Sequence, residues 1–179
     1  MSAPGPDRMA SAPSVPVAPA TLDHAGIATR VPHTGAMCLL HSLLRWDADE
    51  LECSIVNHAD AAHPLREPIE TSGGAPGGSP TMLPAPSAIE YAAQAMALHA
   101  ALNAAAGAPP TPGFLASARD VRLFVDRLDT ATGPLRVHAR RLAGDERQAI
   151  YRFALHDAPG RVLVEGRATV VLNSPLPQR

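Results

Sequence analysis

One long stretch of the chain is apolar on nearly every helical face and carries helix start and stop signals. Residues 83–107 are mostly Ala, Leu and Met, a composition typical of a buried helix rather than a surface helix. Ser87 stands three positions before Glu90, the spacing of a capping box, and Gly107 is followed by Ala-Pro-Pro. We therefore predict one buried helix, in which Glu90 is the only ionisable side chain of the first two turns.

Segments with a period of two lie on both sides of this helix. In residues 50–56, Leu51, Cys53 and Ile55 share one face and polar residues share the other, which indicates a half-buried antiparallel strand. Residues 134–142 and 149–157 alternate in the same way, and Gly-Asp and Pro-Gly turns connect the strands of the last third. The remaining strand predictions are a turn followed by a strand within 31–44, two short pieces within 113–125, and a last strand at 161–172.

A meander of strands that covers a helix apolar on all sides must curl about it. This pattern predicts an α+β protein with the hotdog fold, a curled antiparallel sheet wrapped around one long central helix. Residues 1–25 are rich in Pro and Ala and are predicted to be a disordered leader. The domain then spans residues 26–174, with a flexible Gly/Pro/Ser-rich insert at 67–82.

Charge and cysteine content narrow the possible functions. All 15 basic residues are Arg, which excludes lysine Schiff-base chemistry and a Walker phosphate loop. The net charge of −2 gives no case for binding nucleic acid or a membrane. Cys38 and Cys53 are too few for a disulfide framework or a four-ligand zinc site. We expect a cytoplasmic protein with no metal and no cofactor.

Three motifs resemble the hotdog family of 3-hydroxyacyl acyl-carrier-protein dehydratases, and most closely its aryl polyene branch. The segment 31–40, with Pro32-His33 before Gly35 and an apolar run, resembles the family's opening motif. The segment 84–95, in which Glu90 is followed four positions later by Gln94, resembles its helix start. The segment 113–121, which starts at Gly113-Phe114-Leu115, resembles the strand after the helix.

The resemblance implies a lyase that dehydrates 3-hydroxyacyl thioesters carried on acyl carrier protein to trans-2-enoyl thioesters, in fatty-acid-like or aryl polyene biosynthesis. It implies Glu90 as a catalytic acid, and His33, Gln94 and Gly113 as substrate-binding residues. It also implies a homodimer with the site at the interface. In such a site an imidazole can remove the C2 proton, while a carboxyl kept protonated by dry surroundings protonates the leaving hydroxyl.

The catalytic base is left open between two histidines. Better-known housekeeping dehydratases carry a histidine in a Gly-His-Phe-Pro turn before the helix, and this chain has no such turn. The nearest approximation is His63-Pro64-Leu65, 27 positions before Glu90, and His58 competes with it. The other histidines are expected to be structural or exposed: His24, His41, His99, His138 and His156.

Two alternative functions remain. A hotdog acyl thioesterase would use the carboxylate to activate water, and a hotdog subunit without a base would be a non-catalytic partner. Arg119, Arg122 and Arg127 are either a solvated edge or candidates for docking an acidic carrier protein and its pantetheine phosphate.

Overall fold

The computed structural model of the chain describes residues 21–69, 80–104, 113–145 and 147–172. The leader prediction for residues 1–20, and the insert prediction for 70–79, lie outside these residues. Within the predicted leader, residues 24 and 25 are helical. They begin helix α1 (His24–Ala28), whose N-cap Asp23 accepts a hydrogen bond of 2.8 Å from the Gly26 backbone N–H.

Eight strands, two α-helices and two 3-10 turns make up the described chain. Their bounds, in chain order, are α1 (His24–Ala28), η1 (Gly35–Met37), β1 (Ser42–Trp46), β2 (Glu50–Ile55), β3 (Glu67–Pro68), β4 (Thr81–Met82), η2 (Ala85–Ser87), α2 (Ala88–Asn103), β5 (Gly113–Leu123), β6 (Leu135–Gly144), β7 (Gln148–His156) and β8 (Val162–Leu172). None of the described helices has the length and apolar character needed to cross a membrane.

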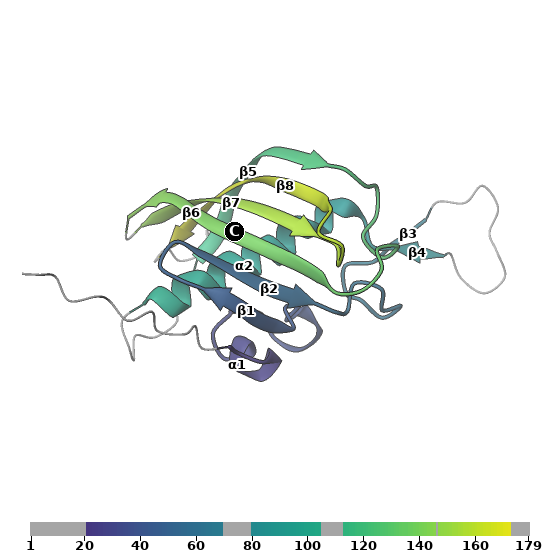
Figure 1. Ribbon diagram of the computed structural model, residues 1–179, viewed down its shortest axis with the longest axis horizontal. Coiled ribbons are helices and arrows are strands. Elements are labelled where there is room, and N and C mark those ends of the chain that lie inside the picture. The colour runs from purple at the N-terminus through teal and green to yellow at the C-terminus, as the bar shows by residue number, and fades with distance from the viewer. Residues whose placement is uncertain (1–20, 70–79, 105–112, 146, 173–179) are drawn as a thin grey trace, which may run out of the picture.

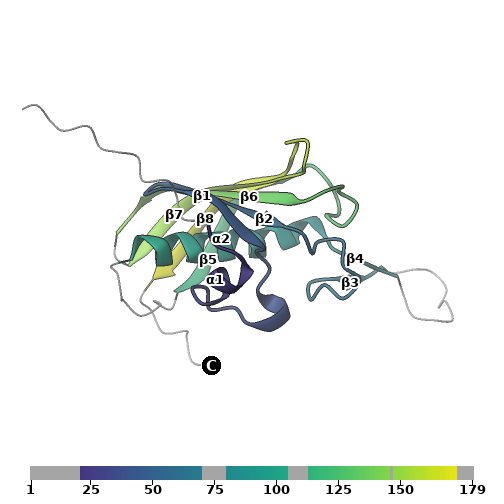
Figure 2. The same ribbon diagram turned by 60° about the horizontal axis from the view of Figure 1, so that its bottom comes forward.

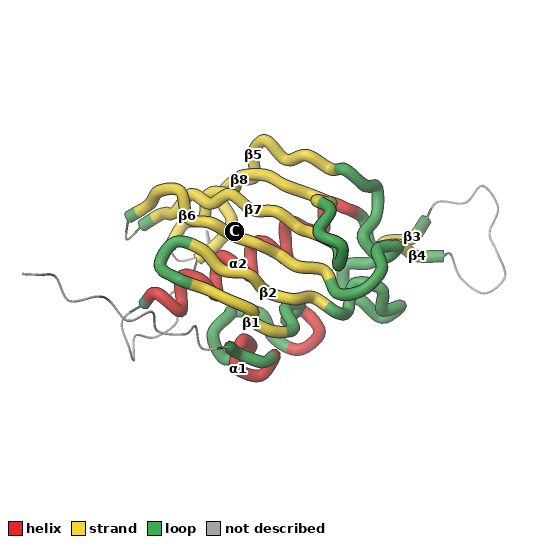
Figure 3. The backbone as a smooth tube through the Cα atoms, in the orientation of Figure 1, coloured by secondary structure: helices red, strands yellow, loops and turns green. Residues whose placement is uncertain are grey.

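Six of the strands form one antiparallel sheet in the order β1-β2-β6-β7-β8-β5. In Figure 1 the sheet faces the viewer and α2 lies behind it, and Figure 3 shows the same layering by element type. Turned by 60°, the molecule shows α2 beneath the curved sheet and α1 below β1 and β2 (Figure 2). This is the hotdog fold predicted from the sequence. The short ladder β3–β4 joins the two ends of the predicted insert.

The start of the central helix differs from the predicted capping box. The turn η2 runs directly into α2, and Ser87 has helical backbone angles and no side-chain capping bond. Its backbone N–H donates instead to the Pro84 carbonyl at 3.0 Å. Two prolines at positions 84 and 86 pre-set this tight turn, so the helical path begins before the predicted N-cap. Gly107, the predicted stop, lies outside the described residues.

The sheet buries most of α2 but leaves one stripe of it half-buried. The fully buried side includes Tyr91, Ala95 and Leu98, whereas Ile89, Ala93 and Ala97 along one line are half-buried. The curled sheet therefore covers α2 on one side and leaves this stripe partly open.

The strand faces were predicted correctly, and one strand is longer than predicted. Tyr151, Phe153 and Leu155 of β7 point into the core, each contributing about 1.5–3 kcal/mol by burial. Residues 113–123 form one continuous strand, not two pieces, because β-bulges between Leu115 and Ser117, and between Arg119 and Arg122, absorb the breaks in alternation.

A buried carboxylate ties three segments together ahead of α2. Asp129, whose side chain is 6% exposed, lies 3.1 Å from the Arg66 guanidinium and accepts a 2.8 Å hydrogen bond from Arg127 Nε. The Leu83 backbone N–H also donates to it. The hydrogen bonds from Arg127 and from the Leu83 backbone N–H stabilise the charged carboxylate. They outweigh the effect of burial and hold the pKa of Asp129 far below its usual value. This carboxylate thus fixes the segment from which α2 starts.

We predict that Asp129→Asn lowers the free energy of unfolding by about 2 kcal/mol at pH 7, because charge-assisted hydrogen bonds are lost. The pKa of Asp129 is depressed in the folded state, so its contribution is complete above the unfolded value of about 4 and disappears as the pH falls below it. Urea unfolding at neutral and acidic pH measures this. The difference in free energy of unfolding between wild type and Asp129→Asn should become smaller in acid. The control Asp49→Asn, at an exposed position, should unfold like the wild type at both pH values. A difference for Asp129→Asn that does not change with pH would contradict this role of the carboxylate.

Candidate active site

Glu90 lies in the first turn of α2, and its carboxylate contacts two side chains. Glu90 Oε1 lies 3.1 Å from His33 Nε2 and accepts a 3.1 Å hydrogen bond from Gln94 Nε2. The carboxylate is therefore engaged by side chains and not by the backbone of Ser87, as a capping box would require. His33 and Glu90 are both partly open, with side chains 27% and 32% exposed.

Gln94 fastens the loop that carries His33 to the central helix. Its amide is fully buried, one turn after Glu90 on the same helix face. Gln94 Oε1 accepts from the Leu39 backbone N–H at 2.9 Å, and Nε2 donates to the Met37 carbonyl at 2.8 Å as well as to Glu90. Because one end of the amide accepts and the other donates, these partners also fix its orientation.

The local sequence around His33 makes a tight turn toward the helix. Gly35 has a φ of +57°, which a residue with a Cβ rarely adopts, and it begins η1. Met37 and Leu39, the two backbone partners of Gln94, follow within and just after this turn. The Pro-His-x-Gly spacing therefore places the imidazole over the first turn of α2.

The second ring nitrogen of His33 has no partner within the described part of the chain. His33 Nδ1 is buried and makes no hydrogen bond there. When Nε2 carries the proton and donates it to the Glu90 carboxylate, Nδ1 is left as the basic nitrogen. The two groups together can hold, accept or release a proton.

His63 contacts α2 through Tyr91, the residue that follows Glu90. His63 Nδ1 accepts from the Leu65 backbone N–H at 3.2 Å, so Nε2 carries the proton and lies 2.9 Å from the Tyr91 hydroxyl. Both side chains are buried. Burial lowers the pKa of His63 and raises that of Tyr91. His63 is thus a neutral imidazole beside the residue that follows Glu90.

His58 precedes His63 in the loop after β2, and its side chain contacts the backbone of Ala131. Its Nε2 lies 3.0 Å from the Ala131 carbonyl, to which it donates, and its buried Nδ1 has no partner among the described residues. Neither His58 nor His63 makes a hydrogen bond to Glu90 in the described chain. The histidine that contacts Glu90 is His33, which the sequence analysis gave as a substrate-binding residue.

The other predicted residues fall elsewhere. Gly113 opens β5 opposite Leu172, at the far end of the central helix from Glu90. A Cβ there would meet the Val171 carbonyl oxygen at 2.8 Å, so close packing of the backbone explains this glycine. Arg119 and Arg122 are exposed on β5, while Arg127 is held by Asp129.

The sequence held a signal for the pairing of His33 with Glu90, namely a histidine in the opening motif and a glutamine four positions after the glutamate. It held none for Tyr91, because an apolar helix gives an aromatic residue no distinguishing pattern. The described chain contains no group of three or more His, Cys, Asp and Glu side chains that could bind a metal ion.

Comparison with known proteins identifies related structures. The chain resembles a structure of the dehydratase heterocomplex ApeI:P from Xenorhabdus doucetiae, with 22% identity, 83% of this chain and 91% of the other covered, and a TM-score of 0.64. A mutant thioesterase from Pseudomonas aeruginosa (14% identity, 74% and 80% covered, TM-score 0.48) and the PaaI protein of Escherichia coli (8%, 72% and 80%, 0.48) are more distant. No curated protein matches the chain.

The match to a family profile is more specific than these structural likenesses. The profile of the ApeP-like family, described as ApeP dehydratase, matches residues 25–178 and so covers the whole predicted domain and the candidate site. The chain therefore belongs to the ApeP-like dehydratase family.

Proposed function

We propose that this protein dehydrates 3-hydroxyacyl thioesters on an acyl carrier protein to trans-2-enoyl thioesters, in aryl polyene or related fatty-acid-like biosynthesis. The observation that carries the proposal is the contact between His33 and Glu90, with Gln94 holding both the carboxylate and the loop of the histidine. Membership of the ApeP-like dehydratase family supports the reaction type.

The reaction moves two protons and breaks one bond. A base removes a proton from C2, which the thioester carbonyl makes weakly acidic, and the electron pair forms the C2–C3 double bond. The C3–O bond breaks, and the hydroxyl leaves as water after taking a proton from an acid. A pair that accepts one proton and donates another has the same charge before and after the reaction.

Glu90 and His33 fit these two roles within one chain. Glu90 is the acid: one oxygen is engaged by His33 and Gln94, and its partly exposed side chain can present the other to the substrate hydroxyl. His33, which shares a proton with Glu90, is the base that we favour. His63 and His58 remain the alternative bases, because His63 is held neutral beside Tyr91 and a neutral imidazole suits proton abstraction near pH 7.

The fold supports a partner subunit. β5 is an eleven-residue strand at the edge of the sheet, and Leu123 and the adjoining Phe124 are 47% and 55% exposed. An open edge of that length invites pairing with another strand. The half-buried stripe of α2 gives a second surface to cover. We propose that two subunits pair through β5, as a homodimer of this chain.

We predict that Glu90→Gln lowers kcat for enoyl product by about a hundredfold or more, because the side chain can no longer donate a carboxyl proton. Product is followed by the ultraviolet absorbance of the enoyl thioester, together with a thiol reagent that would reveal hydrolysis instead. Glu67→Gln, an exposed change in β3, is the matched control and should leave kcat unchanged. Release of free thiol by the wild type would contradict dehydration and identify a thioesterase.

Single replacements of the three histidines distinguish the base. We expect His33→Gln to lower kcat as much as Glu90→Gln, since both remove the same proton-sharing contact. His58→Gln and His63→Gln should have smaller effects, with circular dichroism used to check that each variant is folded. Loss of activity in His63→Gln with His33→Gln active would transfer the role of base to His63.

We predict a mass near twice the chain's 18.6 kDa by analytical ultracentrifugation. Phe124→Lys should shift the protein toward monomer, because a charge would be buried at the paired edge. Leu142→Lys is the control, since Leu142 is 45% exposed but lies on β6 inside the sheet. A wild-type monomer, or equal effects of the two variants, would argue against pairing through β5.

A further inference from the structure

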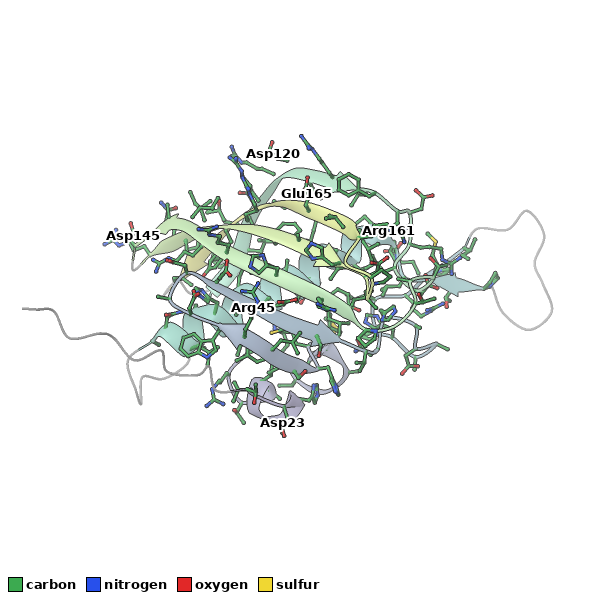
Figure 4. The ribbon with its side chains drawn as sticks, in the orientation of Figure 1. Asp23, Arg45, Asp120, Asp145, Arg161 and Glu165 are labelled. Carbon is green, nitrogen blue, oxygen red and sulfur yellow. The ribbon has the colours of Figure 1, made fainter. Side chains whose placement is uncertain are left out.

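Four arginines on the outer face of the sheet lie directly opposite one another on four adjacent strands. The strand registers pair Arg140 of β6 with Arg152 of β7, Arg152 with Arg167 of β8, and Arg167 with Arg119 of β5. All four side chains are exposed, and we call them the arginine row. Figure 4 looks onto this face, with Asp120 and Glu165 labelled near its β5 end and Arg45 near the β1 edge.

The neighbouring row on the same face, two residues along the strands, has the opposite design. It runs from Arg45 through Glu52, His138, Ala154 and Glu165 to Arg122. Its basic and acidic members pair, as Arg45 does with Glu52 at 2.8 Å and Arg122 with Glu165 at 3.6 Å. Complementary cross-strand charges are the stabilising arrangement, and like charges directly opposite are destabilising. The arginine row breaks this rule three times in succession.

Little within the chain neutralises the arginine row. Among the described residues, Arg140, Arg152 and Arg119 form no ion pair, and Arg167 has only an exposed contact of 3.9 Å with Asp120. Glu50 lies opposite Arg140 on β2, but its carboxylate already contacts Arg45 and His138 of the neighbouring row. Exposed pairs at such distances contribute little. The row is therefore a local cost to the free protein.

The row ends in a hollow made by an irregular strand. Asp120 has a φ of +53°, a conformation uncommon for a residue other than glycine, and it lies in the β-bulge between Arg119 and Arg122. A cavity of about 530 Å³ opens there, and its lining combines Arg122, Arg152 and Arg167 with the carboxylates Asp120 and Glu165. Acidic groups can thus approach the guanidinium groups from the side as well as from above.

We propose that the arginine row is a docking surface for an acidic α-helix of a partner protein, lying across the strands. Neighbouring strands are about 4.8 Å apart, and a helix advances about 5.4 Å per turn. One carboxylate per turn would therefore meet one arginine per strand over the length of the row. Guanidinium groups suit this task because they bind carboxylates through two parallel hydrogen bonds. This surface is on the face of the sheet opposite α2, and the inference does not depend on the dehydration reaction.

The test uses two peptides and two pairs of substitutions. The first peptide is an alanine-rich helix with glutamates spaced alternately three and four residues apart, and the second has the same composition with its glutamates clustered at one end. Binding is measured by fluorescence anisotropy at low ionic strength. Arg140→Gln with Arg152→Gln removes two arginines that have no ion-pair partner among the described residues, and Arg30→Gln with Arg147→Gln removes the same charge elsewhere.

The wild type should bind the regularly spaced peptide more tightly than the clustered one. The row variant should bind the regular peptide about fivefold or more weakly, and the control variant should match the wild type. The row variant should also unfold at the same or a higher urea concentration than the wild type, since a repulsive pair has been removed. Equal losses in both variants, equal binding of both peptides, or destabilisation of the row variant alone would overturn the proposal.

Discussion

The candidate site depends on one buried amide. Gln94 lies on the central helix, yet both of its amide groups bind the backbone of a segment more than 50 positions earlier in the chain. A buried amide that left these groups unpaired would cost about 1–3 kcal/mol for each, so the loop of His33 and the helix of Glu90 cannot separate cheaply. The position of the imidazole over the carboxylate follows from this attachment. The geometry of the candidate site and the stability of the fold therefore depend on the same hydrogen bonds.

The architecture could be predicted from the sequence because the helix and the strands differ in the spacing of their apolar residues. A stretch without polar faces could only be a buried helix, and the alternating segments of β6 and β7 could only be half-buried strands. In the structure Val137 and Phe153 are buried. Boundaries were harder to predict. The prolines before α2 favour a 3-10 turn over a side-chain cap at Ser87. The bulges of β5 interrupt the alternation of buried and exposed residues, so one long strand resembles two short ones in the sequence. Helix α1 is too short to show a period.

The candidate site was only partly accessible to sequence reasoning. Glu90 and Gln94 were found because they interrupt an apolar helix at a spacing of four, which places both on one face. The base was sought where the resemblance places a histidine, in the loop before the helix, and its identity stays a prediction. The turn at Gly35 and the two bonds to Gln94 bring an earlier segment, with His33, onto Glu90. The loop of His58 and His63 instead packs against Tyr91 and Ala131.

The candidate site and the outer face of the sheet carry different kinds of basic group. On the outer face, guanidinium groups carry most of the positive charge and stay protonated at every pH that a cell experiences, and His138 adds one imidazole beside Glu50. The candidate site instead combines the imidazole of His33 with the carboxyl of Glu90, two kinds of group that can exchange protons with a substrate. The guanidinium groups of the outer sheet cannot do so, and they serve as permanent charges. The candidate site and the arginine row are thus separated by the thickness of the sheet, and they also differ in the type of basic group that each carries.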